Sequence, residues 1–470
     1  MIARCNLILI GACALITGCA VQTATPLQRD IPTEFDNAHP AGAQWPAQDW
    51  YRDFGSDELN GFIDQAVKAN TDLTAARARV TQADARARQA GAAILPTIDG
   101  NGTANYLAGH SSQGGGHELD WSAMLSASYE VDFWGKNRAT AESARLLAGA
   151  SRADRDAIAL TTLAGVADAY FQLLALRERL TVAQSNSDAA GQLLQVVKTR
   201  FDARIASPVD LATQQAAYDA AQIAISDLQA QEAQARTALS VLLGRVPEEF
   251  GVKGQPLDSL REPQLGAGLP SELLARRPDI LLAESNLRSA HADLIAARAA
   301  MFPSLSLTAG AGVQNPALPA TVLTIAGTGP SFALGANLVQ PIFDHGKLKA
   351  QRDEVAAKEV ELLSAYRASI LAALTDVENT LSAIQQLNQA REFEVESVAQ
   401  TERAFEGAKA RYQAGSGDFL TLLEAQRTLY AARDLFIQYK LARLQALVGL
   451  CKALGGGWTS QQTQPAVAKQ

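Results

Sequence analysis

The stretch LAGVADAYFQL at residues 163–173 decides the fold, and LTDVENTLSAI at residues 374–384 repeats its pattern 211 positions later. In both stretches the apolar residues are spaced three, four and three apart; they are Leu163, Val166, Tyr170 and Leu173, and then Leu374, Val377, Leu381 and Ile384. This is the spacing of a coiled-coil seam. Its recurrence predicts two long packed helices that arose by duplication.

The duplication extends over most of the chain. Leu95-Pro96 matches Phe302-Pro303 at an offset of 207, and Gly135-Lys136 matches Gly346-Lys347 at an offset of 211. A period of this length indicates a whole unit copied in tandem, because solenoid repeats span about 20 to 50 residues. We predict two copies, residues 55–244 (copy one) and 270–455 (copy two). A linker rich in Pro and Gly, residues 245–269, joins them.

Proline placement predicts unusually long helices. No Pro occurs between Pro96 and Pro208, or between Pro341 and Pro465, and these windows are rich in Ala, Gln, Leu, Glu, Arg and Lys. Because Pro breaks a helix interior and the other residues favour helix, each window permits a continuous helix. A helix from Lys136 to about Ile205 would be about 105 Å long, which is a rod and not part of an ordinary globule.

Between the helices the apolar residues recur every second position. This alternation predicts strands at about 97–107 and 119–131 in copy one, and at about 304–313 and 331–340 in copy two. Each is about as long as a tilted strand that crosses a bilayer. Residues 108–118, with three successive glycines, and 314–330 are predicted to be exposed loops. Two hairpins of a soluble, half-buried sheet would show the same alternation.

Four strands cannot close a membrane barrel, because the smallest barrels have about eight and lipid does not tolerate open strand edges. The barrel would therefore be shared among chains. Two chains would give eight strands around a filled interior, and three would give twelve strands around a passage lined by the polar strand faces.

The N-terminus reads as a processed segment. Residues 1–18 have the charge, apolar run and small residues of a signal peptide. Residues 15–19, LITGC, resemble the bacterial lipobox, which implies that Cys19 carries a covalent lipid, including palmitate, at the start of an acylated extension, residues 19–54. An ordinary signal peptide with a chance Cys is the alternative. After cleavage only Cys451 is unmodified, so one chain forms no disulfide framework. Residues 456–470 form a C-terminal tail.

Composition excludes several classes of protein. The chain is 47% hydrophobic and 19% charged, and its mean hydropathy of −0.04 is too polar for a bundle of spanning helices. A net charge of −8 without a basic cluster argues against nucleic-acid binding. Enzyme motifs for phosphate or zinc are absent, and the five histidines are scattered at His39, His110, His117, His291 and His345. We expect no enzyme, no metal site and no cofactor beyond the lipid, and a capping or interface role for Asp344-His345.

Four motifs in this order inside a tandem duplication resemble the TolC-like outer membrane factors, in their acylated, NodT-like multidrug-efflux branch. They are WYRDFG at 50–55, YEVDFWGK at 129–136, QPIF at 340–343 and RYQAG at 411–415. The resemblance implies a mainly α fold with a small β part and a homotrimer in the outer membrane of a Gram-negative bacterium. It also implies a twelve-stranded barrel, continued by a helical barrel across the periplasm. Such a duct serves an inner-membrane RND-type pump through a periplasmic adaptor protein.

The resemblance also implies site residues at the periplasmic turns. The gate would be formed by Leu420 as a plug, Glu424 as an acidic ring and Arg427, whose spacings of four and three share one helical face. A solvated Glu with an Arg partner three residues on is the alternative. The copy-one positions, Val209, Thr213 and Ala216, carry no charge. Asp210 and Tyr412 would lock the tip, although Gly417 stands where some relatives have a basic residue. The expected adaptor contacts are Ala206, Ser207, Pro208, Ser416, Gly417 and Asp418.

Other functions stay open at this point. The same channel fold could serve type I protein secretion or metal export, and neither the 3 Met nor the scattered His form a metal-capture cluster, which a passive duct would not need. A periplasmic coiled-coil lipoprotein that never inserts is a second alternative. The paired amphipathic strands favour the channel.

Overall fold

A computed structural model describes residues 32, 34–35, 45–111, 114–319 and 329–458. The predicted signal peptide, Cys19, His39 and the last twelve residues lie outside this part of the chain. Both copies follow one order of elements. In copy one these are α3 (Thr71–Ala92), β1 (Thr97–Ser111), β2 (Gly114–Val131), α4 (Lys136–Asp202) and α5 (Pro208–Leu242); in copy two they are α7 (Pro278–Ala299), β3 (Ser304–Pro319), β4 (Gly329–Val339), α8 (Lys347–Gln413) and α9 (Phe419–Ala453).

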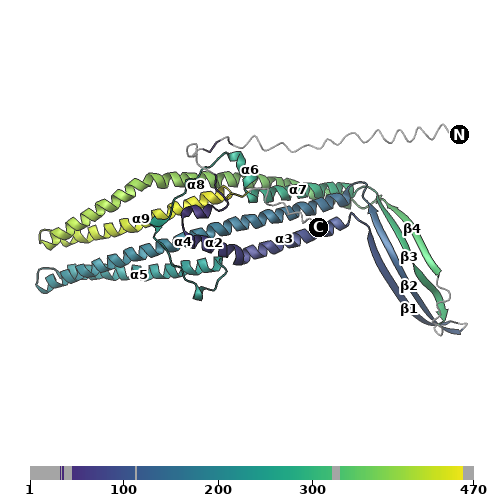
Figure 1. Cartoon of the computed structure of the whole chain (residues 1–470), viewed down its shortest axis with the longest axis horizontal. Coiled ribbons are helices and arrows are strands. Elements are labelled where there is room, and N and C mark those ends of the chain that lie inside the picture. Colours follow the sequence, from purple (N-terminus) through teal and green to yellow (C-terminus); the bar gives the residue numbers. More distant parts are fainter. Residues whose placement is uncertain (1–31, 33, 36–44, 112–113, 320–328, 459–470) are drawn as a thin grey trace.

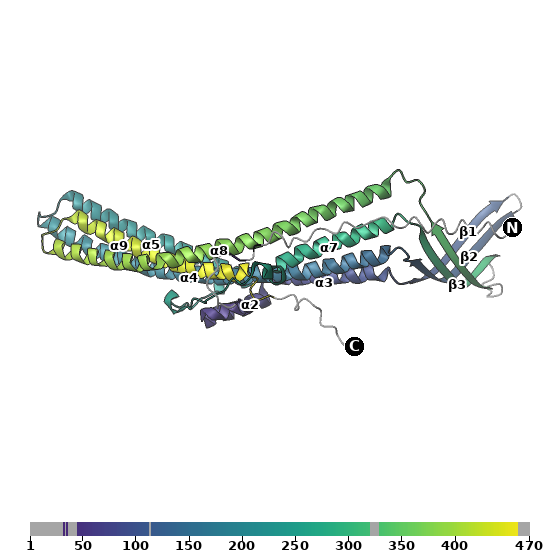
Figure 2. The same ribbon diagram turned by 90° about the horizontal axis from the view of Figure 1, so that it is seen from above.

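The equivalent helices have identical lengths of 22, 67 and 35 residues in the two copies. This confirms the predicted mainly helical fold and its tandem duplication. The helices lie along one axis, with the strands at one end and the α4–α5 and α8–α9 hairpin ends at the other (Figures 1 and 2). A short helix, α2 (Asp57–Ala69), begins copy one ahead of α3 and packs on α4 near the middle of the rod.

The predicted seam is the core of the molecule. Val166, Tyr170 and Leu173 of α4 and Val377 and Leu381 of α8 are fully buried in one apolar cluster. Helix α4 contacts α3, α5, α7 and α9, so it is the spine of the fold. Its length and composition also suit a membrane span, although 44% of its most apolar window is buried inside the fold.

The linker is a packed segment that follows the core. It contains the short helices η3 (Pro247–Glu249) and η4 (Leu257–Ser259) and ends at η5 (Pro270–Glu272) and α6 (Leu273–Arg276). The Glu58 carboxylate accepts hydrogen bonds from the amides of Lys253 and Gly254, and Glu178 accepts one from the Leu257 amide. Leu257 and Leu260 are buried. Side chains of α2 and α4 therefore fix the path of the linker.

The four strands form one antiparallel sheet in the order β1-β2-β3-β4. The strands are longer than predicted. The loop prediction for 108–118 was wrong for most of that stretch, because the backbone ladder continues to the pair Ser111 and Gly114. Glycine is compatible with an extended strand whose partner supplies the hydrogen bonds, so the triple glycine did not end the hairpin arms. Residues 314–319 likewise belong to β3, whereas 320–328 lie outside the described residues.

The register of the sheet separates its two faces. One row across the strands joins Ile98, Ala127, Ala309 and Leu334, and the next row joins Thr97, Ser128, Thr308 and Gly335. Because side chains alternate between faces along a strand, successive rows point to opposite sides. The sheet thus has one apolar face and one face rich in Ser, Thr and Asn.

Candidate functional site at the helical tip

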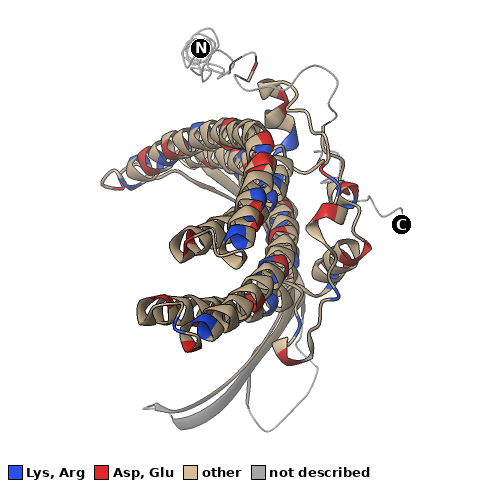
Figure 3. Ribbon diagram, turned by 90° about the vertical axis from the view of Figure 1, so that its left-hand side faces the viewer, with Lys and Arg blue, Asp and Glu red and all other residues tan. Residues whose placement is uncertain are grey.

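The candidate site is the end of the rod where α4 turns into α5 and α8 turns into α9. Figure 3 looks at this end, where the two hairpins lie side by side. Both turns need one residue in the left-handed region: Arg204 with φ 62° in copy one and Gly415 with φ 73° at the equivalent position in copy two. Glycine adopts this conformation without strain, whereas Arg does not.

Each turn is closed by a helix cap. The Ser207 hydroxyl accepts a hydrogen bond from the Asp210 amide, and the Asp210 carboxylate accepts one from the Ser207 amide. In copy two the Asp418 carboxylate accepts hydrogen bonds from the hydroxyl and the amide of Thr421. These bonds lower the pKa of Asp418. The caps therefore fix the residues at which α5 and α9 begin. The cap at Asp418 holds the first turn of α9 in place.

An apolar cluster joins the two hairpins at the tip. Its buried members, the tip cluster, are Val197, Tyr412, Phe419, Leu422 and Leu423. They come from α4, α8 and α9, so one packed unit connects copy one with copy two close to the turns.

The predicted gate residues lie on the opposite face of α9. Leu420 is 67% exposed, and Glu424 and Arg427 are exposed as well. The structure thus brings all three onto one open helical face, as their spacing predicts. No ion pair joins Glu424 to Arg427 among the described residues. In a single chain these side chains meet no partner surface, and only other chains could complete a plug and an acidic ring.

The predicted lock is not formed within the chain. Asp210 uses its carboxylate in the cap of α5, and the Tyr412 ring is buried against Phe419, with ring centroids 6.1 Å apart. Within the described part of the chain, no hydrogen bond connects the two side chains. A lock between Asp210 and Tyr412 stays a prediction.

The other end of the long helices has matched junctions with the strands. Gly135 and Gly346, with φ of 78° and 83°, precede α4 and α8. The Asp344 carboxylate accepts hydrogen bonds from the amides of Gly346 and Leu348, which lower its pKa. The expected capping role of Asp344 is confirmed. Large apolar side chains gather at these junctions in exposed positions; they are Phe133, Trp134, Phe302, Ile342 and Phe343.

Comparison with known proteins identifies the family. A sequence model described as outer membrane efflux protein matches residues 62–245 and, a second time, residues 269–456. The chain belongs to the outer membrane efflux protein family. The two matches follow the duplication, and the two-faced sheet and long hairpins described above are the fold of this family.

Relatives of this efflux protein cover nearly its whole length. The pyoverdine export outer membrane protein OpmQ of Pseudomonas aeruginosa is 42% identical over 97% of this chain and 98% of the relative. The toluene efflux pump outer membrane protein TtgC of Pseudomonas putida is 30% identical over 90% and 92%. Among solved structures, the outer-membrane channel OprN has a TM-score of 0.85 at 27% identity and covers 94% of this chain and 100% of that one.

The predicted adaptor contacts of this efflux protein surround the two turns. Ser207, Pro208, Ser416 and Asp418 are exposed, whereas Ala206 and Gly417 are half-buried. A Cβ added to Gly417 would lie 3.0 Å from the Tyr412 nitrogen and from the Arg411 Cβ. The turn therefore leaves little room for a side chain at position 417.

One residue of the tip, Arg200, was not predicted from the sequence. The Arg200 guanidinium donates hydrogen bonds to the carbonyl oxygens of Tyr412 at 2.7 Å and Gln413 at 3.3 Å. It also lies over the Tyr412 ring, 4.2 Å from the centroid. The only signal was that Arg200-Phe201 repeats as Arg411-Tyr412. A repeat cannot tell which of two equivalent arginines reaches across to the other hairpin.

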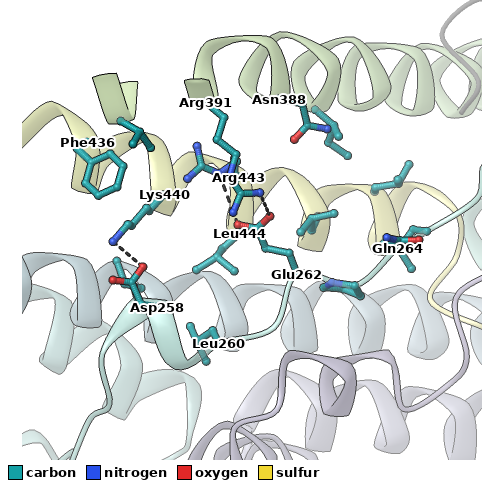
Figure 4. Close-up of a pocket in the computed structure, with 17 residues that line it drawn as sticks. Asp258, Leu260, Glu262, Gln264, Asn388, Arg391, Phe436, Lys440, Arg443 and Leu444 are labelled. Carbon is teal, nitrogen blue, oxygen red and sulfur yellow. Dashed lines mark hydrogen bonds and ion pairs between the residues drawn. The ribbon is translucent and has the colours of Figure 1, made fainter. Parts of the chain in front are cut away.

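A groove lies midway along the efflux protein, between the linker and helices α8 and α9 (Figure 4). It encloses about 1000 Å³. Arg443 of α9 donates to Glu394 of α8 at 2.9 Å, and both side chains are 6% exposed. Glu262 of the linker pairs with Arg391 and Arg443 at 3.2 and 3.5 Å. These pairs attach the linker to copy two. In the described residues, no three His, Cys, Asp or Glu are placed to hold a metal.

Proposed function

We propose that this protein is the exit duct of a tripartite efflux system. Three chains would close a twelve-stranded barrel in the outer membrane, and their hairpins would form a helical tube that reaches into the periplasm. There the tip would meet a periplasmic adaptor and, through it, an inner-membrane RND-type pump. The duct would be passive, since the pump supplies the energy.

The sheet carries this proposal. Its apolar rows suit lipid and its polar rows suit a water-filled lumen, so the sheet fits a barrel wall. Within the described residues, β1 and β4 each pair on one side alone. Because open edges are not tolerated in lipid, β4 of one chain would pair with β1 of the next. The exposed aromatic residues at the strand–helix junctions fit the membrane–water interface.

We propose small organic compounds as the cargo. The similarity to proteins named for pyoverdine export and for toluene efflux supports an exported small molecule, such as a drug or another toxic compound. The cargo would be chosen by the pump before it reaches the duct. We also propose that a lipid on Cys19 anchors the chain to the outer membrane.

The gate provides the test. Replacing Leu420 by Gly together with Glu424 by Ala removes the plug and the acidic ring, and we expect a higher single-channel conductance in planar bilayers. The matched control is Val209→Gly with Thr213→Ala, the equivalent positions of copy one, which should change conductance less. Unchanged conductance in the first variant would place the gate elsewhere. A wild-type protein that forms neither trimers nor channels would reject the duct itself.

A further inference from the structure

We infer that Arg200 is a positioning residue of the tip, which fastens the end of α8 to the end of α4 and so sets how far the two hairpins separate at the gate. This inference rests on the proposed duct function. It assigns to Arg200 the role that the family resemblance gives to Asp210 and Tyr412.

The end of α8 has carbonyl groups that need donors. The last carbonyls of a helix have no partner within it and carry partial negative charge. The Arg411 carbonyl accepts from the amides of Ser416 and Gly417, and the Tyr412 carbonyl accepts from the Gly415 amide. Within the described residues, the hydrogen-bond donor to the Gln413 carbonyl is Arg200. A guanidinium suits this place, because it offers several donors and a permanent positive charge.

The contact is specific to one copy. Arg411, the equivalent of Arg200 in copy two, is exposed, and within the described part of the chain it makes no side-chain hydrogen bond or ion pair. Copy one has Phe201 where copy two has Tyr412, so both copies offer an aromatic ring at this position, but within the described residues only the Tyr412 ring is covered by the equivalent arginine of the other copy. Duplication therefore produced two arginines, and the fold uses one of them to bridge the hairpins.

Arg200 is connected to the gate through packed side chains. Its guanidinium lies on Tyr412, and Tyr412 packs with Phe419, Leu422 and Leu423 at the start of α9. Leu420 and Glu424 belong to the same turns of α9. A shift of the α8 end relative to α4 must therefore carry the gate face with it.

Within the part of the chain that the structure describes, two polar side-chain contacts join α4 to α9, and both lie farther from the turns than Arg200. Arg179 donates to Asp434 at 2.7 and 3.2 Å, and Gln426 donates to Asn186 at 3.4 Å. These contacts hold the hairpins together along the rod. Among these three contacts Arg200 lies closest to the turns, so its loss should loosen the tip while the rod stays assembled.

The test measures single-channel currents of the purified full-length trimer in planar bilayers. Arg200→Ala should raise the ratio of open to closed time about tenfold, which corresponds to about 1.4 kcal/mol. Arg411→Ala is the matched control and should leave the ratio unchanged. Arg200→Lys keeps the charge but not the planar fork, and should restore part of the closed time. The thermal midpoint should stay close to that of the wild type in all three.

A fourth variant separates Arg200 from the lock predicted by resemblance. Tyr412→Phe keeps the ring and the carbonyl but removes the hydroxyl, so the Arg200 contact predicts wild-type gating, whereas a lock through the Tyr412 hydroxyl predicts more opening. Equal gating in Arg200→Ala and Arg411→Ala would overturn the inference, provided that the double variant at Leu420 and Glu424 does raise conductance. If wild-type protein forms no channel, the duct proposal fails instead.

Discussion

At the scale of single residues, Asp168 is a charged side chain within the core stretch of α4. One of its carboxylate oxygens is buried without a hydrogen-bond partner among the described residues. Burial raises the pKa of Asp168 to about 6, and the Lys452 ammonium offsets part of the increase. Copy two has Asn379 at the equivalent position. The fold therefore accepts an uncharged side chain of the same shape at this point of the repeat.

Asp168→Asn should stabilise the protein above pH 6. The folded state holds a proton on Asp168 up to about pH 6, whereas the unfolded chain releases it near its ordinary pKa of 3.8. Stability from this group is thus present at low pH and lost as the pH rises through that window. The variant avoids the loss, which we place at about 1 kcal/mol per chain because the side chain is partly exposed. Thermal unfolding at several pH values between 4 and 8 measures it. A difference between variant and wild type that does not grow with pH would contradict this account.

Residue positions at the tip were predictable only in part. The spacing of Leu420, Glu424 and Arg427 places them on one face of a helix, and the structure has them there. The role of Arg200 was not predictable, because it depends on which hairpin end its side chain meets. Asp210 illustrates the same limit, since a carboxylate at the third position of a helix can cap its own chain as easily as bond to another helix.

At the scale of elements, periodicity predicted the long helices well. The stretch from Lys136 to about Ile205 is helical to Asp202, because the absence of Pro and the spacing of the seam residues both favour a continuous helix. Strand ends were predicted less well. The glycines at 114–116 favour a turn locally, but cross-strand pairing with residues 109–111 outweighs that preference. These partners lie only three to seven residues apart, so the pairing of the two hairpin arms, and not the residue types alone, sets where the strands end.

Gly312 shows how closely β2 and β3 approach. A Cβ at this position would lie 2.4 Å from the Ala123 oxygen and 2.8 Å from the Met124 Cα, whereas one at Gly310 would have no contact closer than 3.6 Å. Gly312→Ala should therefore disturb the strand pair at a cost of about 1 to 3 kcal/mol, and Gly310→Ala should not. The amount of heat-resistant trimer in outer membrane fractions measures both. Equal amounts from the two variants would show that the strands can separate without cost.

At the scale of the whole molecule, the two faces of the sheet predict opposite responses to a charge. Leu334 is exposed on the apolar face, while Asn337, three residues along β4, belongs to the polar face. Leu334→Arg should cost about 2 to 4 kcal/mol if that face meets lipid near the bilayer midplane, and few trimers should assemble. Asn337→Arg should assemble normally and change conductance instead.

The same pair of variants distinguishes the duct from a periplasmic lipoprotein that never inserts. A sheet that stays in water would tolerate Arg at either position, so equal assembly and solubility of the two variants would argue against a membrane barrel. The sequence alone showed that apolar and polar residues alternate along the strands, but not that the sheet closes into a barrel. Closure depends on contacts between chains, which no pattern within one chain records.

The matched lengths of the two copies have a consequence for symmetry. A trimer of this chain would carry six hairpins of nearly equal shape around its axis, although it contains three chains. Charge does not follow shape, because Glu424 and Arg427 occur in copy two while Thr213 and Ala216 take their places in copy one. The end of the tube would thus be close to sixfold in outline and threefold in electrostatic potential. A partner that recognises the shape of the surface would find six equivalent binding positions there, whereas a partner that recognises charge would find three.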